Sequence, residues 1–329
     1  QHRPHPLAAA GDKVTGELKW MVGELKRVDA SPVLHQGLVL FASFANQGNW
    51  LHAVHADTGN EAWKREVAGI GNSSPLLHEG KLLIAGQKEL LCLDPRDGRV
   101  LASYDNTCDF PGETAVHANR IVSIQIQDYE VNDYQGLGTL VCYDQNTQSV
   151  AWKLPLNACS FGKIHCDNRN CYFGTRDGSF TAVDLAKGTV VWQTDCSSLF
   201  VNKERVWPAN DVIDNGTSLI ITCFSQLLSD PGAMVCIDKA NGGIVWSVMN
   251  ALPFSGSNGL TDDSVVTVTL DHKVMRIDRA SGKLRFQGLL PRANPTSHGE
   301  TYHLALDSGH AFIVGADHQV WRLKLAALK

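Results

Sequence analysis

Short runs of apolar and β-branched residues alternate with polar turns along the chain, and one arrangement recurs with a period of about forty residues. An apolar residue is followed by one that is usually Asp, then by a turn centred on Gly and, eight positions after the Asp position, by an aromatic residue, as in residues 54–63 and 237–246. This pattern predicts two short strands joined by a tight turn, with the aromatic side chain wedged between neighbouring sheets. Six copies align on the Asp position without gaps: His55, Asp94, Asp144, Asp184, Asp238 and Asp278.

A second hairpin precedes each copy of the motif. Residues 75–86 and 305–315 are examples, rich in apolar residues around a polar turn. Four strands per repeat unit is the composition of a propeller blade. We therefore expect an all-β fold, a β-propeller of four-stranded antiparallel blades.

The seventh unit is divided between the two ends of the chain. Residues 320–325 form a strand without the Gly turn and aromatic residue, whereas residues 12–20 contain both and lack the preceding strands. Joined, the two segments make one blade, so we expect a seven-bladed ring closed by the N-terminal strand, which removes exposed sheet edges. Residues 1–10 are then a tail, and residues 11–329 a single domain.

The spacing of Asp, Thr-Gly and Trp, intact in residues 12–20 and nearly so in residues 55–63, resembles the pyrroloquinoline quinone (PQQ)-like repeat family over essentially the whole chain. The family includes quinoprotein alcohol dehydrogenases, a lipoprotein scaffold of outer-membrane barrel assembly, and sensor domains, so the fold leaves function open. The dehydrogenases use a larger ring, a vicinal Cys-Cys disulfide and calcium. This sequence has no Cys-Cys pair and lacks their long insertions. The resemblance is therefore to the non-enzymatic branch, and neither PQQ nor another cofactor is expected.

Composition changes this picture little. The 329 residues are 43% apolar with a formal charge of -5, which argues against nucleic acid as a partner. No run approaches the length of a membrane span. Buried thiols favour the cytoplasm, while a periplasmic or other extracytoplasmic location is the alternative if a signal segment has been removed ahead of Gln1.

The 13 histidines suggest metal binding, but the repeat explains several of them. His35, His78 and His117 share one position at the entry to the first hairpin turn, where Asp214 and Asp307 stand in other units. Both residue types commonly cap turns, so we interpret them as capping residues and expect no metal site.

One candidate active site lies around the central axis. The inner-strand register contains Ser31, Ser74, Glu113, Gly162, Asn210, Ser257 and His303, of which Glu113 and His303 are titratable. His298 and Glu300 precede His303 and are expected with it at the channel mouth. The spacing lacks the helical pair that makes HExxH specific, so channel lining is the simpler interpretation.

The cysteines are interpreted mainly as small hydrophobic residues. Cys92, Cys142 and Cys236 occupy a position that holds alanine in other units, so we expect them to be buried and reduced. Cys166 and Cys171 flank a four-residue turn and would face each other across a hairpin, which permits a disulfide in an oxidising compartment. A three-thiolate site from Cys108, Cys159 and Cys196 is not supported by their irregular spacing.

Insertions fall on one face of the expected ring, in the loops that join the second strand to the third and one blade to the next. Long loops above a rigid scaffold are typical sites of binding. We therefore expect a non-catalytic scaffold for a protein or peptide, rather than an enzyme; the alternative is a small-ligand lyase or hydrolase with its site at the channel mouth. The expected contact residues on this face are Tyr129, Tyr134, Phe200, Arg205 and Trp207.

Overall fold

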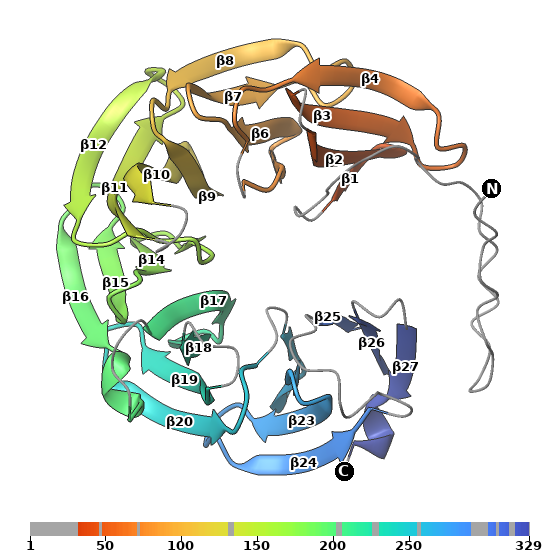
Figure 1. The fold of residues 1–329 in the computed structure, drawn as a ribbon, viewed down its shortest axis with the longest axis vertical. Coiled ribbons are helices and arrows are strands. Elements are labelled where there is room, and N and C mark those ends of the chain that lie inside the picture. Colours follow the sequence, from red (N-terminus) through yellow and green to blue (C-terminus); the bar gives the residue numbers. More distant parts are fainter. Residues whose placement is uncertain are drawn as a thin grey trace.

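Seven antiparallel sheets are arranged in a ring in the computed structural model of the chain (Figure 1). The structure describes residues 32–45, 48–70, 73–130, 135–201, 206–225, 230–254, 258–290, 302–306, 309–315 and 320–328. Six sheets have four strands each, and the last has three within the described residues. We call the sheets blades 1 to 7 in chain order. The predicted all-β propeller architecture is thereby confirmed.

The strands follow one another in sequence order within each blade. Blade 1 contains β1 (Val33–His35), β2 (Leu38–Ala45), β3 (Gly48–His55) and β4 (Glu61–Glu66). Blade 2 contains β5 (Leu76–His78), β6 (Lys81–Ala85), β7 (Glu89–Leu93) and β8 (Val100–Asp105). Blade 3 contains β9 (Phe110–His117), β10 (Arg120–Glu130), β11 (Gln135–Asp144) and β12 (Ser149–Leu156). Blade 4 contains β13 (His165–Cys166), β14 (Asn170–Gly174), β15 (Ser179–Asp184) and β16 (Val190–Asp195).

The second half of the ring repeats this order. Blade 5 contains β17 (Val206–Asp214), β18 (Ser218–Ser225), β19 (Gly232–Asp238) and β20 (Ile244–Asn250). Blade 6 contains β21 (Gly259–Leu260), β22 (Ser264–Val268), β23 (Lys273–Asp278) and β24 (Leu284–Leu289). Blade 7 contains β25 (Tyr302–Leu306), β26 (His310–Gly315) and β27 (Val320–Lys324). Two 3-10 helices, η1 (Ser197–Leu199) and η2 (Leu325–Ala327), are the helices of the described residues, and neither is long and apolar enough to cross a membrane.

The core lies between blades, and the strand sequences show why. The second and third strands, such as β6 and β7, are almost continuously buried because both of their faces pack against neighbouring blades. The fourth strands, such as β4, alternate between exposed and half-buried positions because one face meets solvent. The cysteines that occupy alanine positions are buried as expected, with Cys92 3%, Cys142 0% and Cys236 2% exposed.

In four blades the Asp of the motif holds the turn between the third and fourth strands. In blade 5, Oδ1 of Asp238 accepts hydrogen bonds from the backbone N–H groups of Ala240, at 2.7 Å, and Asn241, at 3.3 Å. A carboxylate that accepts hydrogen bonds from the next backbone N–H groups favours a turn over continuation of the strand. The same arrangement recurs at Asp144, Asp184 and Asp278.

In blades 1, 3, 4 and 5, the tryptophan of the motif docks on the glycine turn of the next blade. Trp63 of blade 1 donates through Nε1 to the carbonyl oxygen of Pro95 at 2.9 Å, and a Cβ on Gly98 would lie 2.7 Å from its ring. Gly98 also has φ 70°, a conformation that favours glycine. In these four blades the predicted wedge is therefore a contact between one blade and the next. The other three contacts are Trp152 with Gly188, Trp192 with Gly242, and Trp246 with Gly282.

Blade 3 departs from the glycine rule for a structural reason. Its turn has Gln148 at the glycine position, with φ 53°. The preceding blade has Ala102 where the other five copies of the motif have an aromatic residue. Where no tryptophan ring covers the turn, a Cβ has room, and only the cost of the left-handed backbone conformation remains.

The expected closing strand, residues 12–20, lies outside the described residues. The same is true of His298 and Glu300.

Candidate interaction site on the loop-rich face

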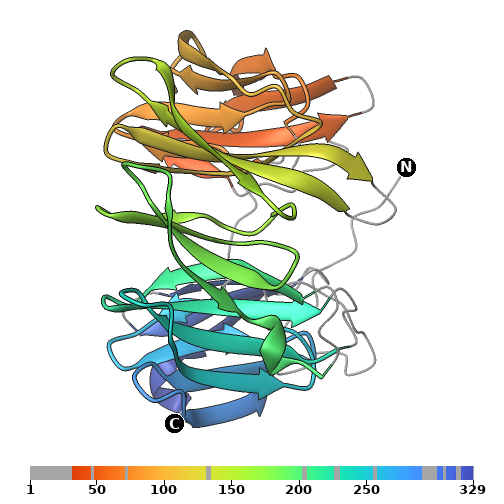
Figure 2. The same ribbon diagram turned by 90° about the vertical axis from the view of Figure 1, so that its left-hand side faces the viewer.

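The ring has two unlike faces. The tight turns, those after His35 and at Gly59 with their equivalents, lie on one face, and the connections between blades lie on the other, which we call the loop-rich face. In Figure 2 the arrowheads of the fourth strands point toward this loop-rich face. β10 and β11 of blade 3, with 11 and 10 residues, are the longest of the described strands, and their hairpin extends on this side.

A ladder of aromatic side chains with an arginine at its centre crosses the loop-rich face. The Arg176 guanidinium carbon lies 4.5 Å from the ring centroid of Phe161 and 3.7 Å from that of Trp207. Phe110 meets Phe161 edge-on, with ring centroids 5.5 Å apart, and Phe224 meets Trp207 edge-on at 5.2 Å. We call these five residues the aromatic ladder. All five are half-buried, and they come from blades 3, 4 and 5.

Backbone contacts fix the centre of the ladder. The N–H of Arg176, in the loop between β14 and β15, donates to the carbonyl oxygen of Cys159 at 3.0 Å. Trp207 and Phe224 are direct partners across β17 and β18. Cation–π contacts of this kind contribute about 0.5–2 kcal/mol each, according to their exposure to water. The ladder is thus a rigid surface formed by rings that are partly exposed.

The insertion in blade 3 is an ordered hairpin at its base. β10 and β11 pair as far as Glu130 with Gln135, with a bulge at which Asp128 has φ 52°. The N–H of Asp128 donates to Oδ2 of Asp109 at 2.7 Å, and Nε2 of Gln127 donates to the carbonyl oxygen of Thr107 at 2.9 Å. These bonds hold the hairpin against the connection from blade 2.

The expected contact residues fall into three groups. Trp207 belongs to the aromatic ladder. Tyr129 lies on β10, where only its backbone is described, and Tyr134 and Arg205 lie outside the described residues. Phe200 differs from the expectation, because it is 6% exposed and packs in the core between blades 4 and 5. The sequence placed it in a long connection, but η1 folds that connection back onto the core.

A second polar group lies on the innermost strands. Lys163, just before β13, donates from Nζ to Oδ1 of Asp211 on β17 at 2.7 Å. Oδ2 of Asp211 accepts hydrogen bonds from the backbone N–H and Nδ2 of Asn258, both at 3.0 Å. Asp211 is 5% exposed, so these bonds compensate its burial. With Glu113 on β9, these residues form what we call the axial cluster, which joins blades 3 to 6.

Glu113 is the titratable member of the axial cluster near neutrality. Burial raises the pKa of its carboxyl to about 7, while the positive charge of Lys163 and a backbone hydrogen bond act in the opposite direction. A carboxyl group with such a pKa can exist in both protonation states at neutral pH. It is therefore chemically suited to proton transfer.

The structure corrects the inner register by one residue in two blades. In blade 3, His117 closes the first turn by pairing with Arg120. The residues that do this in blades 4 and 5 are Asp167 and Asn215, each one position later than Cys166 and Asp214. Counting back from them places Lys163 and Asp211 level with Glu113, where Gly162 and Asn210 were expected. The inner-strand register therefore contains Lys163 and Asp211 as titratable residues besides Glu113 and His303. His303 lies on β25 with only its backbone described.

The residues that the structure describes do not form a ready calcium site at the axis. Both oxygens of the Asp211 carboxylate already have partners, Lys163 on one side and Asn258 on the other. Among the described residues, no three His, Cys, Asp or Glu side chains are grouped to hold a metal ion. The absence of PQQ stays a prediction.

Two of the histidines at the first turn, His78 and His117, do something other than capping. Nε2 of His78 lies 2.9 Å from the carbonyl oxygen of Ala118, and Nε2 of His117 lies 2.8 Å from Oδ1 of Asn168. Each bond therefore crosses to the turn of the next blade. Capping does occur at this position in blade 4, where Oδ1 of Asp167 accepts from the N–H groups of Arg169 and Asn170. The difference arises because an imidazole reaches beyond its own turn.

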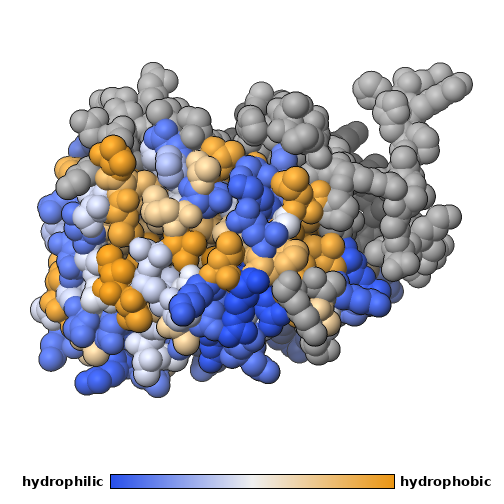
Figure 3. All heavy atoms as spheres, turned by 90° about the horizontal axis from the view of Figure 1, so that it is seen from below, coloured by the Kyte–Doolittle hydropathy of each residue, from blue (hydrophilic) through white to orange (hydrophobic). Residues whose placement is uncertain are grey.

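The outer rim offers a less specific surface. Exposed aliphatic side chains stand on the fourth strands, including Val245 at 54% and Leu289 at 68% exposure. Figure 3, which views the ring from the side of β24, shows such groups interrupted by hydrophilic ones. Scattered apolar residues of this kind are normal on soluble surfaces.

Comparison with known proteins identifies the repeat. A family model described as outer membrane protein assembly factor BamB matches residues 5–194, 86–225 and 230–327. The crystal structure of BamB from Moraxella catarrhalis superposes with a TM-score of 0.61 at 14% identity, covering 91% of this chain and 83% of that one. No curated protein matches the chain in sequence.

Two further structures share the fold. A europium-containing methanol dehydrogenase superposes with a TM-score of 0.60 at 12% identity, covering 87% of this chain and 72% of that one. The computationally designed protein Ika8 superposes with a TM-score of 0.51 at 11% identity, covering 92% of this chain and 98% of that one. Because one is an enzyme and the other a designed protein, the shared fold does not decide function.

Proposed function

Since this chain belongs to the PQQ-like repeat family, with a match to the model of the outer membrane protein assembly factor BamB, we propose that it is a non-catalytic scaffold that binds a protein or peptide through its loop-rich face. An assembly factor acts on other proteins, so the proposed partner is a protein. The repeated Trp–Gly contacts give the ring a rigid frame, which limits the entropy lost when the face binds.

The observation that carries this proposal is the aromatic ladder. Tryptophan and arginine are the residue types most enriched where truncation weakens protein interfaces. Arg176 and Trp207 are packed against each other at 3.7 Å, so each is held in place before a partner arrives. The neighbouring hairpin of β10 and β11 would flank the partner, and Tyr129, Tyr134 and Arg205 are the further contacts that we propose.

The variant Arg176→Ala tests the proposal, and Arg99→Ala is its matched control. The side chain of Arg99 is 63% exposed and lies on the tight-turn face. The wild-type chain is used as bait in native lysate, and retained proteins are quantified by mass spectrometry. We expect a protein whose retention falls about tenfold or more with Arg176→Ala and is unchanged with Arg99→Ala. Both variants should stay folded, with Arg176→Ala melting a few degrees lower because its two cation–π contacts are lost. Normal retention by Arg176→Ala together with loss by Arg99→Ala would move the binding face to the other side.

The same repeat supports closure of the ring by residues 12–20. Gly59 of blade 1 has φ 71° and donates its N–H to the carbonyl oxygen of His55 at 2.8 Å, matching the turns that receive a tryptophan. Blade 7 precedes blade 1 around the ring, so the aromatic residue for Gly59 must come from that blade. Residues 12–20 contribute Trp20 at the spacing of the motif.

The axial cluster favours a second candidate function, a small-ligand lyase or hydrolase. Glu113, with a pKa of about 7, is the residue that would transfer a proton, and Lys163 would attract an anionic group. Elemental analysis of the purified full chain distinguishes a metal-assisted lyase or hydrolase from a scaffold. A stoichiometric divalent ion supports the enzyme. An Arg176-dependent protein partner without such an ion supports the scaffold.

A further inference from the structure

The two cysteines of the innermost hairpin of blade 4 are direct cross-strand partners. Cys166 on β13 pairs with Cys171 on β14. The N–H of Asp167 donates to the carbonyl oxygen of Asn170 at 2.9 Å and closes the turn, so the next pair outward is a non-hydrogen-bonded pair. At such a pair the Cα atoms are about 4.5 Å apart, within the range of about 4.4–6.8 Å that a disulfide requires.

The other blades show that this pairing is not demanded by packing. Where blade 4 has two cysteines, five blades have two aliphatic residues and blade 5 has Asp214 opposite Leu219. The aliphatic pairs are Leu34 with Val39, Leu77 with Leu82, Val116 with Ile121, Leu260 with Val265, and Leu306 with Ala311. Both cysteines therefore replace aliphatic residues at a single cross-strand site.

The surroundings give the two thiols different accessibility. Cys166 is half-buried, whereas Cys171 is 0% exposed, and both pack in the core between blades 3 and 4. A hydrogen bond with Cys166 and burial raise the pKa of the Cys171 thiol well above its ordinary value. Cys166 is thus the thiol that a reagent reaches first, and Cys171 is placed to react with it next.

We propose that Cys166 and Cys171 form a reversible disulfide by exchange with a small-molecule disulfide such as oxidised glutathione. The Cys166 thiolate attacks one glutathione sulfur, the glutathione S–S bond breaks, and one glutathione leaves as a thiolate. Cys171 then attacks Sγ of Cys166, the bond between Cys166 and glutathione breaks, and the second glutathione takes the proton of Cys171 and leaves as a thiol. Two protein thiols are oxidised, and one glutathione disulfide is reduced to two thiols.

The disulfide would fasten β13, the two-residue innermost strand that follows Phe161 and Lys163 in the chain. β13 pairs with β14 at only two positions, so a covalent link there restricts its separation from the blade. This inference does not depend on the proposed scaffold function.

Peptide mapping of the full chain tests the link directly. The protein is equilibrated with oxidised or with reduced glutathione, alkylated with N-ethylmaleimide under denaturing conditions, and digested with trypsin without reductant. Because Arg169 separates the cysteines, residues 164–169 and 170–176 become two peptides that only a disulfide can join. We expect the joined pair after oxidation and two alkylated peptides after reduction.

Cys166→Ala and the matched variant Cys92→Ala complete the experiment. Oxidation should raise the melting temperature of the wild type and of Cys92→Ala, whose thiol is 3% exposed in another blade, and leave that of Cys166→Ala unchanged. If Cys166→Ala does not fold, the wild-type peptide map still decides. Two alkylated peptides after oxidation, or a link from either peptide to the peptide carrying Cys142, would overturn the proposal.

Discussion

At the scale of single residues, the repeat couples each tryptophan to a glycine in the following blade. Trp63 and Gly98 are in contact, and where Ala102 replaces tryptophan, the following turn has Gln148 instead of glycine. The glycine is therefore needed for two separable reasons, a left-handed backbone and the absence of a Cβ beneath an indole ring. Most turns of this kind require glycine for the first reason alone.

Gly98→Ala should cost more stability than Gly80→Ala. Both glycines have left-handed φ, 70° and 73°, but a Cβ at Gly98 would lie 2.7 Å from the Trp63 ring, whereas nothing lies within 4 Å at Gly80. The backbone cost is about 1–2 kcal/mol in both variants, and the steric conflict adds about 1–3 kcal/mol at Gly98. Chemical denaturation measures the difference. Equal free energies of unfolding for the two variants would show that the ring moves aside without cost.

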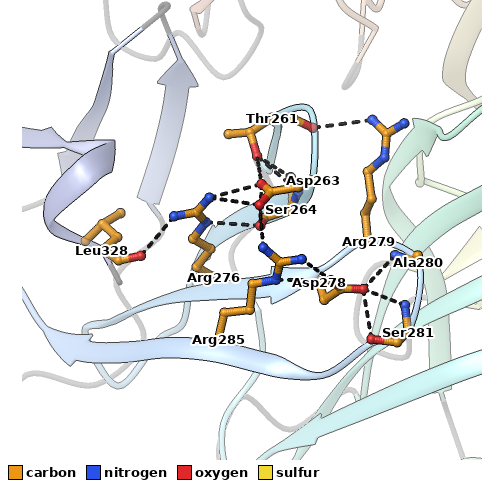
Figure 4. A network of polar contacts seen from close by, with 10 residues as sticks. All are labelled: Thr261, Asp263, Ser264, Arg276, Asp278, Arg279, Ala280, Ser281, Arg285 and Leu328. Carbon is orange, nitrogen blue, oxygen red and sulfur yellow. Dashed lines mark hydrogen bonds and ion pairs between the residues drawn. The ribbon is translucent and has the colours of Figure 1, made fainter.

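At the scale of elements, polar networks reinforce junctions that the core also forms, as between blade 6 and the end of blade 7. In blade 6, Arg276 on β23 contacts both carboxylate oxygens of Asp263, at 3.0 and 3.2 Å, and Nη1 of Arg276 donates to the carbonyl oxygen of Leu328 at 3.2 Å (Figure 4). Arg285 on β24 bridges Asp263 and Asp278. The network thus connects the turn between β21 and β22 with two further strands and with the end of blade 7.

Asp263→Asn should lower the melting temperature at neutral pH by a small amount. Hydrogen bonds from Arg276 hold the pKa of the Asp263 carboxyl well below its ordinary value. A depressed carboxyl pKa contributes stability above the unfolded value of about 3.9, and that contribution is lost as the pH falls toward the folded value. The difference in melting temperature between the variant and the wild type should therefore become smaller as the pH is lowered from 7. Because the ion pair of Asp263 with Arg276 is partly exposed, high salt should also reduce this difference in melting temperature. A difference that grows in acid would contradict a stabilising role for the Asp263 carboxylate.

At the scale of the whole molecule, stability depends on an unbroken ring of blade contacts. Each described Trp–Gly contact joins one blade to the next, and polar bonds from His78 and His117 do the same at the first turns. A ring that fails to close exposes a sheet edge and one uncovered glycine turn. The proposed closure therefore stabilises the ring mainly at the junction between blades 7 and 1.

Deleting residues 1–22 should yield insoluble or strongly destabilised protein, whereas deleting residues 1–10 should leave the melting temperature unchanged. The longer deletion removes the proposed closing strand together with Trp20. Loss of a buried tryptophan alone costs about 3–5 kcal/mol. Solubility and thermal melting compare the two truncations. A longer truncation that folds with the melting temperature of the full chain would rule out closure by this segment.

The sequence by itself determined the repeat, the number of units, the Asp–Gly turns and the buried cysteines at alanine positions. These features depend on neighbours within a few residues, where turn chemistry and strand alternation act directly. Tertiary structure decided the rest. The bond between Lys163 and Asp211 spans 48 residues, and Arg176 meets Trp207 from another blade. The inner turns have the same span in every blade where they are described, but the segment between each of them and the Asp of the motif varies in length. The motif therefore does not fix the inner register, and a shift of one residue in a strand changes which side chain faces the axis.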